Sequence, residues 1–186
     1  MKLVITGVCG ALLWTLMEYL IHRFMAHEYN WPNAFRSEHL RHHFVKDYFA
    51  PSWKKLITAL VVLVAMFGST IFFMELKTAL TFTVCFTVMY LIYELTHWSF
   101  HVFGPTFSYG RKMRKHHFYH HFVNDKMNHG VTTTLWDRVF RTYVKADQVL
   151  VNKKYTMRWL PSDPSGSVVI GRYCKDYKIV PRTRVT

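Results

Sequence analysis

The fold of this chain follows from a run of seven residues, Lys115-His116-His117-Phe118-Tyr119-His120-His121. On a helix, His117, His120 and His121 share one face, because residues three and four positions apart are neighbours on the helical surface. Neutral imidazole is the commonest metal ligand among side chains. The same spacing occurs once more, in His39-Leu40-Arg41-His42-His43. Two such helices facing each other are predicted to hold two metal ions.

The histidines of this chain occur in clusters. None lies in residues 1–21, in residues 44–96 or after residue 129. The twelve are His22, His27, His39, His42, His43, His97, His101, His116, His117, His120, His121 and His129. Histidines scattered over a polar surface would not repeat one spacing twice, and nucleic-acid patches are built from lysine and arginine. We therefore predict a metal-binding protein with no nucleic-acid partner.

Hydrophobic residues make up 51% of the chain, although its formal net charge is +13. The apolar residues are concentrated in three runs, at about residues 3–21, 56–74 and 79–96. Each run would form a helix of roughly 27 to 29 Å, close to the hydrocarbon thickness of about 30 Å. The first run has no small-residue cleavage site before His22, so we interpret it as a retained span rather than a signal peptide. The prediction is an all-α integral membrane protein with about three transmembrane helices.

Lysine and arginine are distributed unequally between the segments that join these runs. Residues 22–55 carry six of them, the turn at residues 75–77 carries one, and the chain after the third run carries sixteen. The positive-inside rule then places the N-terminus outside and every histidine on the cytoplasmic side. The membrane would be a bacterial inner membrane or the endoplasmic reticulum, depending on the source of the protein.

Two parts are expected along the chain. Residues 1–146 would form a membrane domain, whose cytoplasmic helical cap (residues 22–55 and 97–146) carries the histidine-rich dimetal site. Residues 147–186 would form a short, irregular, basic C-terminal tail that either covers the metal site or lies on the lipid surface. Candidate strands in this tail are residues 168–170 and 177–180.

Two local features affect how the histidines are oriented. His27 follows His22 by five residues, which on an α-helix places it about 140° away. The helix must therefore loosen or end there if both residues bind one metal. Glu18 and Glu94 precede His22 and His97 by one turn. Each glutamate is interpreted either as an acceptor for the ring N–H of a metal-bound histidine or as a hydrated residue of the membrane interface.

The type and place of the ligands restrict the chemistry. Histidines in the order two, three, two, three along the chain suit a dinuclear site. No cysteine lies near them, which argues against a thiolate-based structural zinc site, whereas iron, zinc, copper and nickel all accept nitrogen ligands. A site at the membrane surface favours a lipid substrate. Iron with dioxygen is then the combination that can attack an unactivated C–H bond.

Four motifs carry a resemblance to a known family: HRFMAH at residues 22–27, HLRHH at 39–43, HWSFH at 97–101 and HHFYHH at 116–121. In this order, with apolar runs between them, they resemble the membrane fatty acid hydroxylase and sterol desaturase superfamily. Residues 18–24, and Asn128-His129-Gly130 followed by Trp136-Asp137-Arg138-Val139-Phe140, look most like its fatty acid 2-hydroxylase branch. The resemblance covers about residues 10–143. Where that family usually has glycine after the last phenylalanine, this chain has Arg141.

The resemblance implies a centre of two iron ions, which zinc can replace in a purified sample, and dioxygen as the oxidant. Electrons would come from a cytochrome-b-type or ferredoxin-type donor, expected to be a separate protein because the sequence contains no donor domain. The positions that match the family's ligands are His22, His27, His39, His42, His43, His97, His101, His117, His120 and His121. His116 and His129 match no ligand position, although His116 could compete with His117. Together with Glu18 and Glu94, they are candidates for extra ligands or for residues that support the ligands. No catalytic residue separate from the metal ligands is implied.

These observations favour a dioxygen-dependent hydroxylase of a lipid acyl chain. A carotenoid or sterol hydroxylase, or a desaturase, is the alternative within the same chemistry, because hydroxylation and desaturation share the first hydrogen abstraction. A membrane metal transporter or sensor is the alternative of another class. Transporters place ionisable residues near the middle of broken spans, whereas these runs hold only Glu18 and Glu94, both near the same end.

Overall fold

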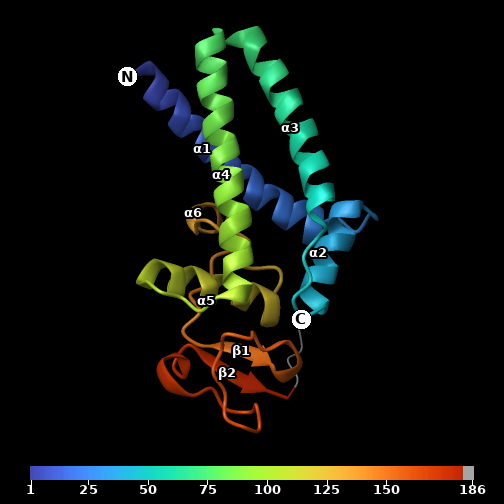
Figure 1. The fold of residues 1–186 in the computed structure, drawn as a ribbon, viewed down its shortest axis with the longest axis vertical. Helices are drawn as coiled ribbons and strands as arrows, with labels where there is room; N and C mark the ends of the chain where they lie inside the picture. Colours follow the sequence, from blue (N-terminus) through green and yellow to red (C-terminus); the bar gives the residue numbers. More distant parts are fainter. Residues whose placement is uncertain (182–186) are drawn as a thin grey trace.

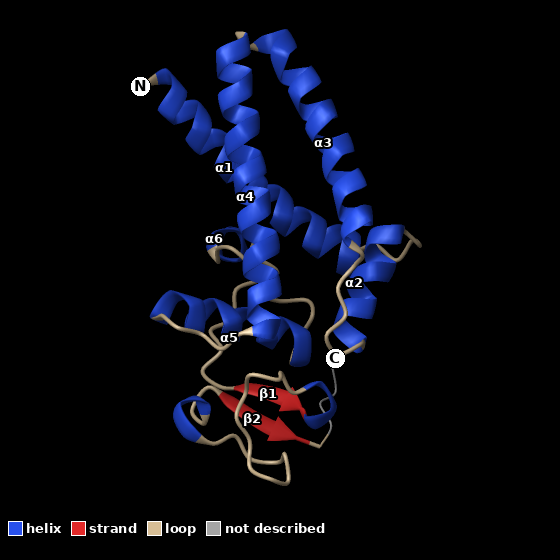
Figure 2. Cartoon of the chain, viewed as in Figure 1, coloured by secondary structure: helices blue, strands red, loops and turns tan. Residues whose placement is uncertain are grey.

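The computed structural model describes residues 1–181 and is mainly helical (Figures 1 and 2). Residues 182–186, the end of the predicted basic tail, lie outside the described residues. The helices are α1 (Lys2–Leu20), the π-helix η1 (Ile21–Glu28), α2 (Ala34–Phe44), α3 (Ser52–Phe73), α4 (Leu76–Val102), α5 (Ser108–Phe122) and α6 (Leu135–Val139). The remaining elements are the strands β1 (Val149–Asn152) and β2 (Tyr177–Val180) and the short 3₁₀ turns η2 (Lys153–Tyr155) and η3 (Gly171–Tyr173).

Three helical segments, Lys2–Glu28, Ser52–Phe73 and Leu76–Val102, are long and apolar enough to cross a membrane. Each coincides with one of the three predicted apolar runs, so the predicted fold class is confirmed. Two of the helices continue past their apolar run, because η1 extends α1 and the last turns of α4 carry His97 and His101. The histidines of η1 and of the end of α4 therefore lie on direct helical continuations of the spans.

The helices α1 and α4 form the main helix pair, and Figure 1 shows α1 crossing α4 at a large angle. Gly10 of α1 permits the crossing, since a Cβ at this position would collide with the backbone carbonyl of Phe82. Trp14 packs edge-on against Phe86 with ring centroids 5.3 Å apart. In contrast, α3 shares a short turn with α4, diverges from it, and buries none of its residues.

The C-terminal tail is folded rather than irregular. Strands β1 and β2 pair in parallel, and Val149 of β1 and Tyr177 of β2 are completely or almost completely buried in a core shared with Phe118 and Phe122 of α5. Trp159 Nε1 donates a hydrogen bond of 2.9 Å to the carbonyl of Phe100. In Figure 1 the strands lie beyond α5, at the end of the molecule away from the α3–α4 turn. The tail thus packs against α5 through this shared core.

Candidate metal centre

The first span ends in a π-helix, which explains how His22 and His27 come together. In η1 the backbone hydrogen bonds join residues five apart, as in the 2.8 Å bond from Tyr29 N to Phe24 O. Residues five positions apart are therefore neighbours on one face. The Nε2 atoms of His22 and His27 both lie near Nε2 of His39, at 3.1 and 2.9 Å. The loosened helix that the spacing of these two histidines requires is present.

The ten histidines at the predicted ligand positions gather into two groups of five. Group 1 is His22, His27, His39, His43 and His120, and group 2 is His42, His97, His101, His117 and His121. Within each group, one candidate ligand atom from every residue lies within 4.8 Å of all the others. Group 1 is built from η1, α2 and α5, and group 2 is built from α2, α4 and α5.

The helices α2 and α5 each contribute to both groups. In α2, the i, i+4 pair His39 and His43 joins group 1, while His42 joins group 2. In α5 the division is reversed, because the i, i+4 pair His117 and His121 joins group 2 and His120 joins group 1. The two groups meet where the rings of His43 and His121 stack in parallel, with centroids 4.0 Å apart. Each HxxHH motif thus serves two sites rather than one.

Backbone carbonyls orient three of the rings. Their Nδ1 atoms lie 2.5 to 2.8 Å from a carbonyl oxygen: His22 with His129, His42 with Tyr48, and His120 with Met127. A carbonyl oxygen only accepts hydrogen bonds, so Nδ1 of each ring carries the hydrogen and Nε2 carries a lone pair. This is the arrangement in which supporting hydrogen bonds prepare an imidazole for a metal.

The environment of His39 fits a positive charge between the rings of group 1. Its Nε2 lies 2.9 to 3.1 Å from the Nε2 atoms of three other rings, those of His22, His27 and His43. A neutral ring nitrogen carries either one hydrogen or one lone pair, so at most one of the three contacts is a hydrogen bond. A cation among these nitrogens turns the remaining lone-pair contacts into coordination bonds. The side chains of group 1 therefore fit a metal ion.

Burial keeps the rings neutral and their lone pairs available. Removal from water lowers the pKa of His42 to about 4. For the same reason, the pKa values of five further rings outside the spans lie well below the usual value: His39, His43, His117, His120 and His121. In group 2, the buried Nε2 atoms of His42, His97 and His121 have no hydrogen-bond partner among residues 1–181. Buried nitrogen acceptors without donors fit a second metal ion.

Glu18 has a different partner from the one that its spacing suggests. Its carboxylate is buried and accepts hydrogen bonds from the backbone N–H groups of Val131, at 2.5 Å, and Thr132, at 3.0 Å. The ring of His22 bonds instead to the carbonyl of His129. Glu18 is therefore neither a direct acceptor for His22 nor a hydrated interface residue. It fixes the segment that supplies the carbonyl for His22.

Asp137 is a central residue of the site that the sequence analysis missed. It is fully buried, and its side chain accepts four hydrogen bonds of 2.8 to 2.9 Å. Their donors are the backbone N–H groups of His129 and Gly130, the hydroxyl of Thr142 and Nε2 of His116. Asp137 thus holds His129 and Gly130, and Glu18 holds the two residues that follow them. In the sequence, the one sign of the importance of Asp137 was its position in Trp136-Asp137-Arg138-Val139-Phe140, a motif that carried the family resemblance but assigned no role to Asp137.

The remaining residues near the two groups have distinct positions. The ring of His129 is buried beside group 1, with its centroid 5.3 Å from that of His120, but it belongs to neither group. His116 also lies outside both groups. Asp125, which the sequence analysis missed, places Oδ2 3.4 Å from Nδ1 of His27, and this contact holds the pKa of Asp125 below its usual value. Asp125 is thus the carboxylate that faces the ring of a group 1 histidine.

A cavity of about 420 Å³ leads from the three spans to the two groups. Apolar side chains of α1, α3 and α4 line most of it, and four histidines line it at the metal groups: His22, His39, His42 and His97. Four of its charged residues form two ion pairs, since Lys54 binds Glu38 and Lys55 lies 2.6 Å from Glu94, and the fifth, Glu18, accepts hydrogen bonds from Val131 and Thr132. The cavity is therefore an apolar chamber that ends at both groups of histidines.

A sequence model of the fatty acid hydroxylase family matches residues 7–142. The chain belongs to this family. The match includes both histidine groups and the buried Asp137, so the two groups are a feature of a fatty acid hydroxylase domain rather than of an unrelated helical bundle. The predicted resemblance is confirmed.

Individual proteins similar to this chain are named as lipid hydroxylases. The ceramide very long chain fatty acid hydroxylase SCS7 of Saccharomyces cerevisiae is 32% identical over 154 residues, covering 78% of this chain and 40% of the relative. The human fatty acid 2-hydroxylase is 33% identical, covering 72% and 38%. The dihydroceramide fatty acyl 2-hydroxylase FAH2 of Arabidopsis thaliana is 29% identical, covering 72% and 58%. The chain thus spans about 40% of the length of the first two relatives.

A solved structure has the same fold. It is described as full-length scs7p with only the hydroxylase domain visible, and it matches with a TM-score of 0.62 and 26% identity. The match covers 79% of this chain and 58% of the other. The helices that bring the histidines together are therefore an architecture shared with another member of the fatty acid hydroxylase family.

Proposed function

We propose that this chain carries the catalytic centre of a membrane-bound, dioxygen-dependent hydroxylase that acts on the acyl chain of a lipid. The observation that carries the proposal is the apolar cavity, which opens among the spans and ends at histidines of both groups. An acyl chain can lie in such a cavity with one carbon near the metals. The relatives named as fatty acid and ceramide hydroxylases support this substrate class.

The cofactor in this proposal is a pair of iron ions, one held by each group of five histidines. Bound there, iron would supply the one-electron chemistry that lets dioxygen oxidise an unactivated C–H bond. Zinc accepts the same nitrogen ligands and can occupy the groups in a purified sample. Both groups border the cavity, group 1 through His22 and His39 and group 2 through His42 and His97, so an ion held in either group would face the space in which the acyl chain lies.

The side chains around the cavity position the substrate and exclude water. Trp14, Phe86 and Leu63 form apolar walls, so an acyl chain is held by burial rather than by polar contacts. The lysines of the cavity are paired with Glu38 and Glu94, and Glu18 is engaged by the backbone of Val131 and Thr132. No separate acid or base is therefore needed in the proposal, and the reacting carbon is selected by the depth to which the chain enters.

The orientation in the membrane and the electron donor are also part of the proposal. The excess of lysine and arginine around the cap supports a cytoplasmic position for both histidine groups. Electrons would come from a separate cytochrome-b-type or ferredoxin-type protein in the same compartment. Per turnover, the substrate, dioxygen, two electrons and two protons give the hydroxylated lipid and one water.

The first test compares the native chain with His39→Ala, which removes the nitrogen at the centre of group 1. Phe44→Ala is the matched control, because Phe44 lies on the same helix with an exposed side chain outside both groups. We expect about two metal ions per chain in the native protein and in Phe44→Ala, and fewer in His39→Ala. A lipid that gains one oxygen is expected with the native protein and Phe44→Ala only. A lipid that loses two hydrogens would indicate a desaturase. Identical lipid profiles for all three folded proteins would refute oxidation of the lipids supplied.

A second test asks whether the acyl chain lies in the cavity. Thr58, Ala59, Val62 and Leu63 of α3 line it, whereas Val61 does not and is exposed. Ala59→Trp is expected to fill part of the cavity and to shift the product toward shorter acyl chains. Val61→Trp on the opposite face should leave the product lengths unchanged. Equal product profiles for Ala59→Trp and the native chain would place the substrate elsewhere.

A further inference from the structure

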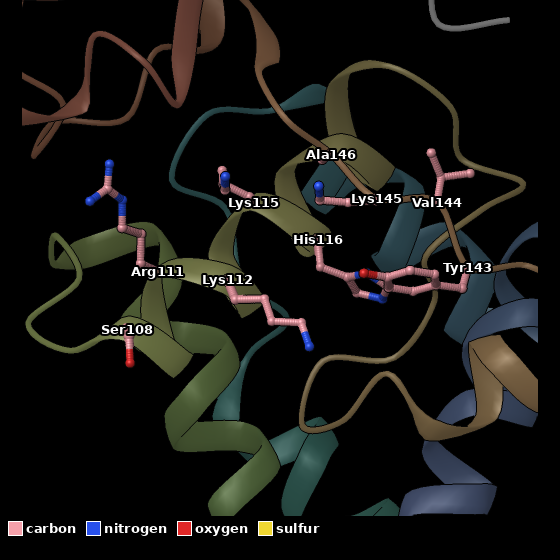
Figure 3. A pocket seen from close by; sticks show the side chains of 9 residues that line it. All are labelled: Ser108, Arg111, Lys112, Lys115, His116, Tyr143, Val144, Lys145 and Ala146. Carbon is pink, nitrogen blue, oxygen red and sulfur yellow. The ribbon is translucent and has the colours of Figure 1, made fainter.

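A second hollow, of about 220 Å³, lies between α5 and residues 143–146 (Figure 3). It is lined by four cationic side chains and no carboxylate: Arg111, Lys112, Lys115 and Lys145. Asp176 pairs with Arg111 and Lys115, and Asp147 pairs with Lys145. Lys112 forms no ion pair with any described residue. The hollow is therefore positively charged even after its neighbouring acids are counted.

The floor of this hollow is connected to both groups of histidines. It is formed by His116, whose side chain lies beside that of Tyr143 in Figure 3. The two rings stack, with centroids 5.7 Å apart and planes inclined by 23°. Along the chain, His116 is followed directly by His117 of group 2. Through space, Nε2 of His116 donates to Asp137, and Asp137 accepts the backbone N–H of His129. The carbonyl of His129 then accepts the ring N–H of His22, a group 1 histidine, at 2.5 Å.

We propose that this hollow is the docking site of the electron donor, and that electrons enter the protein at His116. The inference rests on the proposed function, because only an oxidative reaction needs a donor. The partner that fits is a soluble haem protein with carboxylates around its exposed haem edge. Each docking oxidises one ferrous haem to ferric and delivers one electron, so two dockings supply the two electrons that one turnover consumes.

Two features favour this occupant over an anionic lipid or a free phosphate. The hollow is small, at about 220 Å³, whereas Lys112 and Lys145 at its edge are exposed and can face several carboxylates on the surface of a protein. Its floor also joins the metal groups by one peptide bond on one side and by three hydrogen bonds on the other. A site that only holds an anion has no use for such a connection.

The test uses the full chain in zwitterionic nanodiscs, with the soluble haem domain of a cytochrome-b-type protein as the probe. Lys112→Glu/Lys145→Glu reverses the charge of the hollow. Lys46→Glu/Lys178→Glu is the matched control, because these two lysines are exposed, lie outside the hollow and give the same change in net charge. We expect the first pair to weaken binding of the haem domain about tenfold or more at low salt, and the control pair to change it little.

Reoxidation of the ferrous haem domain by the metal-loaded chain is the second readout. It should slow in the docking variant and not in the control, at unchanged metal content. Equal binding by the docking variant and the native chain overturns the proposal. Equal loss in the control pair also overturns it, because the attraction would then be spread over the whole surface. Loss of binding to anionic vesicles, with haem-domain binding intact, assigns the hollow to lipid headgroups instead.

Failure of this inference is distinguishable from failure of the proposed function. Dithionite can supply electrons without docking. If the native chain hydroxylates lipid with dithionite but the haem domain does not distinguish the docking variant from the native chain, the hydroxylase stands and the docking site falls. If the metal-loaded chain oxidises no lipid with either electron source, the proposed function falls.

Discussion

Replacing Arg141 with glycine is expected to stabilise this protein. Arg141 follows the end of α6 and has a φ of 61°, the left-handed conformation that glycine adopts most readily. The backbone N–H of Thr142 donates to the carbonyl of Asp137 at 2.8 Å, and that of Arg141 lies 3.4 Å from the carbonyl of Arg138. These two bonds form a Schellman motif, whose left-handed position is usually glycine.

The magnitude follows from two opposing terms. The left-handed conformation costs an L-residue about 1 to 2 kcal/mol. Glycine loses more backbone entropy on folding, which returns about 0.5 to 1 kcal/mol of that gain. The guanidinium of Arg141 is exposed and forms no ion pair with residues 1–181, so little else is lost. The net stabilisation is therefore about 0.5 to 1 kcal/mol, which raises the unfolding temperature of a chain of this size by about 1 to 4 °C.

The assay is thermal unfolding in detergent at one fixed scan rate, for the native chain, Arg141→Gly and Arg141→Ala. A fixed rate is needed because unfolding of such a protein is governed partly by kinetics. Alanine removes the guanidinium but keeps the strained conformation, so its unfolding temperature should not rise. The reasoning is refuted if Arg141→Gly lowers the unfolding temperature, or if alanine raises it as much as glycine does.

Three further predictions concern the site. Asp137→Asn removes the charged acceptor that holds the segment behind group 1, and metal analysis should show the content per chain falling from two ions toward one. Gly130→Ala should destabilise the fold by about 2 kcal/mol or more, because its Cβ would collide with a backbone carbonyl, whereas Gly68→Ala, in open space on α3, should not. In the metal-free protein, rings such as His42, with a pKa near 4, stay neutral in the folded state while unfolded histidines bind protons below about pH 6.5. The free energy of unfolding should therefore fall as the pH decreases from about 7 to about 5. If calorimetry finds a higher unfolding temperature at pH 5 than at pH 7, the rings are not buried in their neutral form.

The spans and the histidine clusters could be predicted because both depend on local spacing. A run of apolar residues long enough to cross the bilayer is visible without any tertiary contact. The five-residue interval between His22 and His27 is also local, and it required a departure from α-helical geometry. The π-helix at Ile21–Glu28 provides that departure. In each case the sequence pattern and the helix geometry involve the same few residues.

The partners of the histidines could not be predicted, because they come from distant parts of the chain. The division of α2 between the two groups depends on how this helix is rotated relative to α5, which no spacing within either helix determines. Glu18 binds the backbone of a segment more than 100 residues later. Strand β1 was missed because its residues become strand-like only when paired with β2, and that pairing joins Val149 to Tyr177.

The helices and the loops of the cap contribute different things to the metal centre. Helices fix the spacing of the rings, but each of their backbone carbonyls is normally occupied by a hydrogen bond within the helix. The carbonyls that orient His22, His42 and His120 come from loop residues instead, where such oxygens are free to accept a ring N–H. A loop can orient a ring only if it is itself rigid, and the buried carboxylates of Glu18 and Asp137 provide that rigidity for the loop behind group 1. Both acids therefore influence the candidate metal site through backbone atoms rather than by touching one of its ten rings.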